Sequence, residues 1–222
     1  MKGNWEVLGE AGLQFFGKMS ASISHEIKNA LAIINESAGL LEDLSLRAEK
    51  GIPVDPERLK KQSGSIVKQV RRMDAIIQNM NKFAHSMDEP LKTIDLSETL
   101  ALVTNLSIRF ATMRGVLLAY QRPAAPITIR TSPFFLENLL WVCLDFAMSA
   151  AGSGKTINLL VEKSSGAGRV KFTPLDRISD AKGPEFLEER TKALLAVLQA
   201  ELNMDEGRHE LTLSIGSGGV DG

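Results

Sequence analysis

The sequence is poor in cysteine and aromatic residues, and it has no excess of charge of either sign. Its 222 residues include one cysteine, Cys143, so no disulfide framework is possible within the chain and a reducing compartment fits. The net charge of −1 excludes a strongly basic nucleic-acid-binding protein. No apolar run reaches the roughly 18 residues of a membrane span, and the amino terminus lacks a signal-peptide pattern. We therefore expect a cytoplasmic protein with neither nucleic acid nor membrane as a partner. Three scattered histidines give no metal-site spacing, so we expect no bound metal.

What the sequence does have is a long amphipathic segment, which predicts one helix over residues 5–50. At about 100° per residue, one narrow apolar stripe contains Phe16, Met19, Ile23, Ile27, Ala30, Ile34 and Leu41. His25 lies at about 200° from Ile23, and Asn29 follows one turn later at about 240°. The histidine is therefore predicted to face solvent or a partner, with an amide beside it.

A second helix is predicted over residues 56–86, after a short loop. Gly51 just past the first helix, Asp55 as an N-cap and Pro56 at the first helical position mark the ends. A coiled-coil seam is predicted at Ile66, Val70, Met73, Ile77, Met80 and Ala84. We expect an antiparallel hairpin that pairs with a second copy into a four-helix bundle. The alternative is a hairpin that packs onto its own carboxy-terminal domain.

The pattern changes near Glu89-Pro90, where we place a domain boundary. The predicted domains are a helical hairpin over 1–89, an α/β sandwich over 90–216 and a flexible tail over 217–222. Within the sandwich we expect helices at 95–115, 134–150 and 184–203 and strands at 116–121, 127–130, 157–163, 169–173 and 209–215. The predicted fold class is therefore α+β, with helices segregated from a mostly antiparallel sheet.

The stretch from Phe16 to Leu31, with Ser24-His25-Glu26-Ile27-Lys28-Asn29 at its centre, resembles the H-box of bacterial two-component sensor histidine kinases. The usual proline after the asparagine is Ala30 here, a mild departure. The order of the later elements resembles the ATP-binding domain that follows the H-box in those kinases. The resemblance implies a homodimer in which His25 carries a phosphoryl group, and a fold of the histidine-kinase ATPase type. Because only some two dozen residues precede His25, we expect a kinase-like core without a sensor region.

Three residues are candidates for the chemistry. Neutral imidazole is a good nucleophile near its ordinary pKa of about 6.5, so His25 can accept a phosphoryl group at neutral pH. Glu26 can hydrogen-bond the second ring nitrogen and accept its proton. Asn29 can orient a water or a phosphoryl oxygen, and in the family this amide supports dephosphorylation of the partner.

The ATP site that the resemblance implies is expected to be lost. Val142 and Phe146 stand where the family has magnesium-binding asparagines, and neither side chain offers the oxygen that this cation requires. Asp176 occurs without the glycines of the family motif, and residues 183–187 do not form a glycine-rich lid. Residues 152–156 resemble the end of a P-loop, but a helix is predicted before them and a strand after them, so we expect a plain turn. No nucleotide cofactor is predicted.

The hypothesis is a homodimeric phosphorelay protein with a response-regulator receiver domain as its partner. It would transfer a phosphoryl group between His25 and a receiver aspartate, or remove that aspartyl phosphate. The alternatives are an ATP-dependent histidine autokinase with a divergent site, and a non-enzymatic inhibitor that binds a kinase or regulator. The complete His-Glu-x-x-Asn set argues against a pure inhibitor, which needs none of those groups.

Overall fold

The computed structural model describes all residues except 1–3, 153, 165–166, 180–187 and 217–222. It consists of two compact units, one formed by residues 19–81 and the other by residues 1–18 together with 82–222. The predicted boundary near Glu89-Pro90 stays a prediction, and the predicted tail lies outside the described residues.

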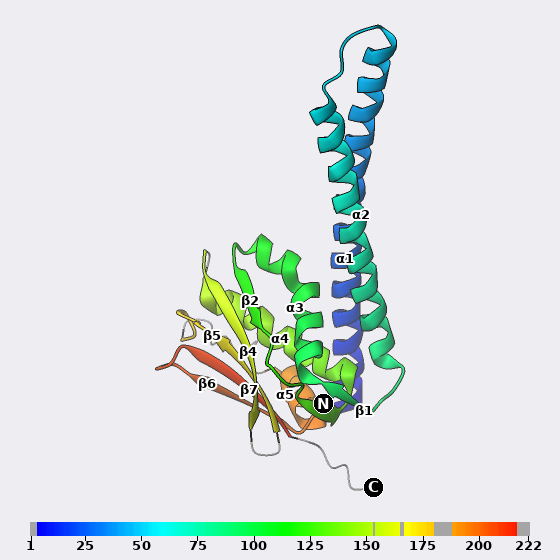
Figure 1. Cartoon of the computed structure of the whole chain (residues 1–222). Helices are drawn as coiled ribbons and strands as arrows, with labels where there is room; N and C mark the ends of the chain where they lie inside the picture. The colour runs from blue at the N-terminus through cyan, green and yellow to red at the C-terminus, as the bar shows by residue number, and fades with distance from the viewer. Residues whose placement is uncertain (1–3, 153, 165–166, 180–187, 217–222) are drawn as a thin grey trace. The chain divides into compact units, whose positions relative to one another are not determined.

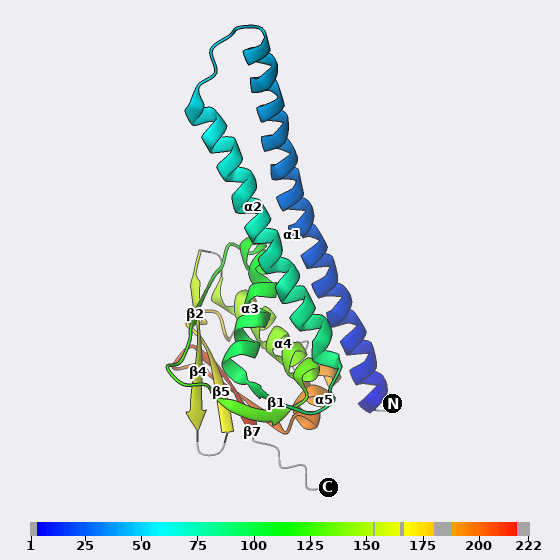
Figure 2. The same ribbon diagram turned by 45° about the vertical axis from the view of Figure 1, so that its right-hand side comes forward.

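The unit of residues 19–81 contains most of the predicted helical hairpin. Helices α1 (Asn4–Glu49) and α2 (Pro56–Ala84) supply it, and they run side by side in both ribbon views (Figures 1 and 2). After α1, Gly51 adopts a positive φ of 73°, and its N–H donates to the carbonyl of Ala48 at 2.9 Å. The Asp55 carboxylate accepts from the N–H of Glu57 at 3.0 Å and so caps α2. The predicted roles of Gly51 just past the first helix and of Asp55 as the N-cap of the second are confirmed.

The buried seam of the hairpin differs in part from the predicted stripe. The buried residues of α1 in this unit are Met19, Ser22, Ile23, Ala30, Ser37 and Leu44, and the four from Ile23 onward repeat every seven residues. A repeat of seven is what a helix shows when it faces one partner helix along its length. Ile27, Ile34 and Leu41 belong to the predicted stripe but are only half-buried, because they lie beside this seam.

The seam on α2 is also shifted from the prediction. Gln69 is the buried residue of α2 within the unit, whereas the predicted seam residues Val70, Ile77 and Met80 remain exposed. A second polar contact lies inside the hairpin, where the hydroxyl of Ser37 donates to that of Ser65 at 3.1 Å. The hairpin thus has a partly polar interior and leaves an apolar flank of α2 uncovered within one chain.

The described residues of the second unit form two sheets. The smaller one pairs β1 (Lys92–Asp95) with β3 (Thr128–Thr131) in antiparallel fashion. The larger has the strand order β2-β4-β5-β7-β6, built from Leu117–Gln121, Thr156–Ser164, Ala167–Thr173, Glu210–Gly216 and Ala200–Asp205. Among the described strands, only β2 and β4 pair in parallel, so the mostly antiparallel sheet is confirmed.

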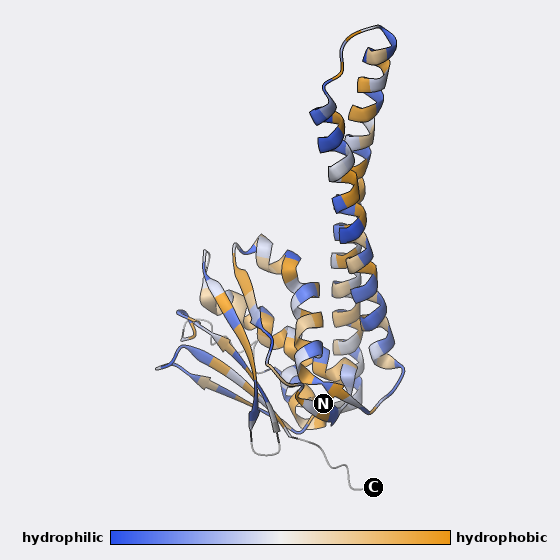
Figure 3. Cartoon of the chain, viewed as in Figure 1, coloured by the Kyte–Doolittle hydropathy of each residue, from blue (hydrophilic) through white to orange (hydrophobic). Residues whose placement is uncertain are grey.

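Helices cover one face of the larger sheet, and they are α3 (Leu96–Met113), α4 (Pro133–Ala151) and α5 (Glu189–Val197) (Figures 1 and 2). A short 3₁₀ helix, η1 (His85–Met87), follows α2. Hydrophobic residues gather on α4 but alternate with hydrophilic ones along α2 (Figure 3). By length and composition α4 could span a membrane, but 78% of its apolar window is buried inside the protein, as in a core helix. The predicted α+β fold, a helical hairpin followed by an α/β sandwich, is confirmed.

Two parts of the predicted element list are corrected. Residues 200–203 were expected to end a helix, yet they form the start of β6, which pairs with β7 from Ala200 opposite Ile215 onward. Gln199 turns the chain between α5 and β6 with a positive φ of 48°, and strand pairing overrides the helix propensity of this segment. Strand β1 was not predicted. The start of the last predicted helix, residues 184–187, lies outside the described residues.

Candidate functional site

His25 and Asn29 lie on the exposed face of α1. Both side chains are exposed, whereas Ile23 is 6% exposed and Ala30 is fully buried. Residues four apart on a helix are neighbours one turn apart, so the imidazole and the amide share one face. The helix face predicted from the sequence for the candidate nucleophile is the face that the structure leaves open.

Glu26 is half-buried, and its carboxylate is engaged by a residue of the other helix. The guanidinium of Arg72 on α2 donates to Glu26 Oε2, and the two form an ion pair across the hairpin. Among the described contacts there is no hydrogen bond between Glu26 and His25. Adjacent residues of a helix diverge by about 100°, so the backbone does not favour such a bond. The predicted role of Glu26 as partner of the imidazole stays a prediction.

Arg72 is a residue of this site that the sequence analysis missed. It lies 46 positions from Glu26, and helical periodicity relates residues only within one helix. Phe15 and Phe83 form an edge-to-face contact 5.3 Å apart between the ends of the same two helices. Such contacts between α1 and α2 form only when the chain folds.

The candidate nucleotide positions lie on α4, in the second unit. Val142 is half-buried and Phe146 is buried, and neither side chain offers an oxygen ligand. One turn before Val142, the fully buried Asn138 accepts a hydrogen bond from Arg190 of α5 at 2.6 Å. The side-chain oxygen of Asn138, which could otherwise bind a ligand, thus already accepts a hydrogen bond from the Arg190 guanidinium within the protein.

Asp176 is exposed and forms an ion pair with Lys155 at 2.9 Å. The hydrogen bond from Lys155 lowers the pKa of the Asp176 carboxyl below its ordinary value. Lys155 belongs to the segment that resembles the end of a P-loop. As expected, the helix α4 precedes this segment and the strand β4 follows it, and Gly152 and Gly154 have positive φ. The expected absence of a glycine-rich lid at 183–187 concerns residues outside those described.

Helix α4 also carries two buried titratable groups whose shifted pKa values were not predicted from the sequence. Glu137 is 3% exposed, and burial raises the pKa of its carboxyl to about 8, although a hydrogen bond with Ser86 opposes the shift. Its Oε2 atom has no hydrogen-bond partner in the described part of the chain. Burial also raises the pKa of the Cys143 thiol, which keeps it protonated and unreactive. Within the described residues, no group of three or more His, Cys, Asp or Glu side chains could hold a metal ion.

Comparison with known proteins identifies the hairpin. Residues 17–89 match the His Kinase A (phospho-acceptor) domain family. No curated protein matches the chain. All of the segment that resembles an H-box except Phe16 lies within this matched range, and the resemblance is confirmed.

Solved structures that are similar to the chain include histidine kinases. The Acinetobacter baumannii histidine kinase AdeS is 14% identical, with 87% of this chain and 98% of that chain covered and a TM-score of 0.45. A histidine kinase from Burkholderia phymatum is 16% identical, with 87% and 95% covered and a TM-score of 0.44. The kinase ThkA, solved in complex with the response regulator protein TrrA, is 18% identical, with 93% and 63% covered and a TM-score of 0.46.

Proposed function

We propose that this chain, which matches the His Kinase A (phospho-acceptor) domain over residues 17–89, exchanges a phosphoryl group between His25 and an aspartate of a response-regulator receiver domain, or removes that phosphoryl group. The observation that carries the proposal is the exposure of His25 and Asn29 on one face of α1, opposite a buried seam. A docked aspartyl phosphate can reach both side chains because they leave the helix about 40° apart.

Transfer needs only groups that the hairpin supplies. A lone pair of the neutral His25 imidazole attacks phosphorus, the bond between phosphorus and the aspartyl oxygen breaks, and the receiver carboxylate leaves with the electron pair. Phosphoryl transfer depends mainly on positioning and charge stabilisation. An acyl phosphate donor therefore makes an ATP domain unnecessary for this step.

Hydrolysis uses the same position with a different nucleophile. In this reaction Asn29 orients a water for attack on the aspartyl phosphate, and inorganic phosphate is released. Glu26 is proposed to accept a proton near the imidazole, and its ion pair with Arg72 holds its carboxylate in place.

The second unit is proposed to lack magnesium-dependent ATP binding and to serve in docking. Val142 and Phe146 cannot ligate magnesium, and Asp176 is already paired with Lys155. A nucleotide at 100 times its dissociation constant would stabilise the fold by about 2.7 kcal/mol, which a thermal unfolding scan detects easily. We expect no shift of the melting temperature with millimolar ATP and magnesium, and a clear shift would favour the autokinase alternative.

The protein is also proposed to act as a cytoplasmic homodimer. The exposed apolar flank of α2, with Val70, Ile77 and Met80, supports pairing with a second hairpin.

The experiment that tests the proposal presents a phosphorylated receiver domain to three forms of the protein. The wild type should accept the label, and the His25→Ala variant should not. The control is His85→Ala, which removes an exposed histidine whose ring contacts Asp88 at 2.7 Å. This control should accept the label like the wild type. Equal labelling of all three forms would remove His25 from the mechanism and favour the inhibitor alternative.

A further inference from the structure

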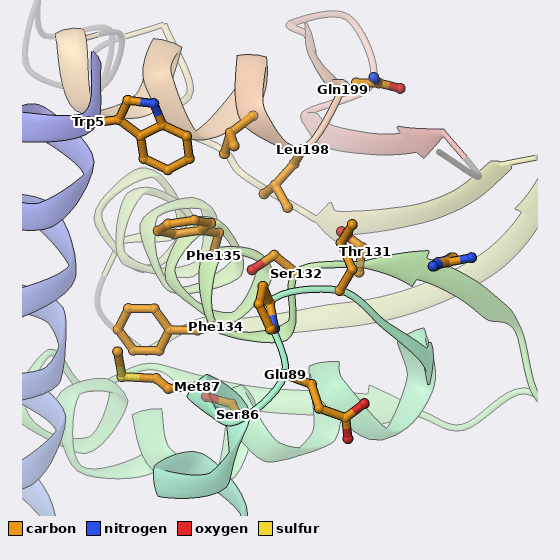
Figure 4. A pocket seen from close by; sticks show the side chains of 14 residues that line it. Trp5, Ser86, Met87, Glu89, Thr131, Ser132, Phe134, Phe135, Leu198 and Gln199 are labelled. Atoms are coloured by element: carbon orange, nitrogen blue, oxygen red, sulfur yellow. The ribbon is translucent and has the colours of Figure 1, made fainter. Parts of the chain in front are cut away.

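A cavity of about 460 Å³ lies within the unit formed by residues 1–18 and 82–222. Its walls come from the start of α1, the segment from η1 to β1, the junction of β3 and α4, and the end of α5. Figure 4 shows the side chains of Trp5, Met87, Phe134, Phe135 and Leu198 arranged around one space. The volume lies in the range of pockets that enclose one small organic molecule. Neither the candidate phosphotransfer residues nor the positions of the predicted nucleotide site line it.

Large apolar side chains are unusually exposed around this cavity. Trp5 is 74% exposed, Met87 59%, Leu91 42% and Val197 38%, and all four are lining residues. Isolated exposed apolar residues need no explanation, but a concentration of them around one hollow is typical of a ligand site. Phe134 is buried at 7% exposure and completes the apolar wall on the α4 side.

Two charged side chains line the cavity, and of these only the cation has no ion pair within the described part of the chain. The side chains of Glu89 and Arg130 both line the cavity. The Glu89 carboxylate is paired with Lys92 at 2.8 Å, whereas Arg130 has no ion pair among the described residues. A guanidinium binds a carboxylate or another planar anion through parallel hydrogen bonds. The lining therefore suits an apolar body with one negative group.

We propose that this cavity binds a small organic anion with an apolar body, which inserts between Trp5, Phe135 and Leu198 and pairs its acidic group with Arg130. The volume limits the ligand to one small molecule. The alternative is that a partner protein covers these side chains. In that case the binding of small probes to the cavity should not depend on their charge.

The test uses two fluorescent probes on the whole chain. One is 8-anilino-1-naphthalenesulfonate, an aromatic anion, and the other is N-phenyl-1-naphthylamine, its uncharged counterpart. We expect the wild type to bind one anion per chain. Trp5→Ala should weaken both probes by about tenfold, since an aromatic wall is lost. Arg130→Gln should weaken only the anion, by about fivefold, since a partly exposed ion pair is lost.

Matched controls separate the cavity from general surface binding. Leu13→Ala removes an apolar side chain that is 77% exposed on the same helix as Trp5 but does not line the cavity. Arg58→Gln removes an exposed arginine from α2. Both should bind like the wild type, and Trp5→Phe should restore most of the affinity lost in Trp5→Ala. Because Trp5 and Arg130 are exposed, these variants should fold, which circular dichroism checks.

Two outcomes would overturn the proposal. If Leu13→Ala weakens binding as much as Trp5→Ala, the probes bind exposed apolar residues in general. If Arg130→Gln weakens both probes equally, or neither, the acidic group does not pair with Arg130 and the proposed ligand class is wrong.

Discussion

Glu26 and Arg72 form an ion pair between the two helices of the hairpin, directly beside the candidate nucleophile His25. The Glu26 side chain is 21% exposed and that of Arg72 is 45% exposed, so solvent screens the pair only in part. The pair connects α2 to α1 at the turn of α1 that carries His25.

The first prediction concerns the strength of this pair. Arg72→Ala should lower the free energy of unfolding by about 1 kcal/mol, because it leaves the half-buried Glu26 carboxylate without its partner. A double-mutant cycle with Glu26→Ala, followed by urea unfolding, should give a coupling energy of similar size. Arg71→Ala, at the exposed neighbouring arginine, should change stability little. A coupling energy near zero would mean that the pair does not stabilise the hairpin.

The second prediction concerns the homodimer. Ile77 is 40% exposed within one chain, and Ile77→Asp should dissociate the dimer because a buried unpaired charge is costly. Lys68→Asp is the control, since Lys68 is exposed and lies about 180° around α2 from Ile77. Light scattering at roughly tens of micromolar should show a dimer for the wild type and the control. A monomeric wild type would contradict the proposed assembly.

The third prediction concerns the pH dependence that Glu137 imposes. Its pKa of about 8 in the folded chain lies above its ordinary value of 4.5, so the folded chain binds this proton more tightly than the unfolded chain. The contribution to stability is complete below about pH 4.5 and is lost as the pH rises to about 8. Glu137→Gln cannot titrate and should remove this loss.

Urea unfolding of the wild type and Glu137→Gln across this range is the measurement. The difference in unfolding free energy should change in favour of Glu137→Gln by up to about 1.4 kcal/mol per pH unit. Glu201→Gln, at an exposed carboxylate of β6, should give the same profile as the wild type. Parallel profiles for wild type and Glu137→Gln would show that Glu137 is solvated in the folded state.

The hairpin and its open face could be predicted because helical periodicity is a local property. The spacing of the apolar residues on α1 placed His25 and Asn29 opposite the seam, and Gly51 and Asp55 marked the turn. The exact seam could not be predicted in the same way. It depends on the partner helix, and the sequence alone did not reveal that Ser37 and Gln69 would be buried there.

The features that the sequence did not reveal depend on contacts between distant segments. Arg72 meets Glu26 only after the hairpin forms, and β6 exists because β7 pairs with it. Glutamate usually lies at the protein surface, and only the packing of α4 shows that Glu137 is buried. The cavity beside Trp5 likewise requires four segments to meet.

The central claim is that His25 itself carries the phosphoryl group, while Asn29 acts chiefly in hydrolysis. The most direct measurement mixes a phosphorylated receiver domain with the protein, maps the phosphoryl group by mass spectrometry and follows the lifetime of the receiver phosphate. The wild type should carry the group on His25. Asn29→Ala should still accept the group, but the receiver phosphate should last longer because the water that attacks it is no longer oriented. Asn35→Ala, an exposed amide six residues further along α1, should behave like the wild type. If no phosphoryl group is found on His25, and neither His25→Ala nor Asn29→Ala alters the receiver's lifetime, the account is wrong.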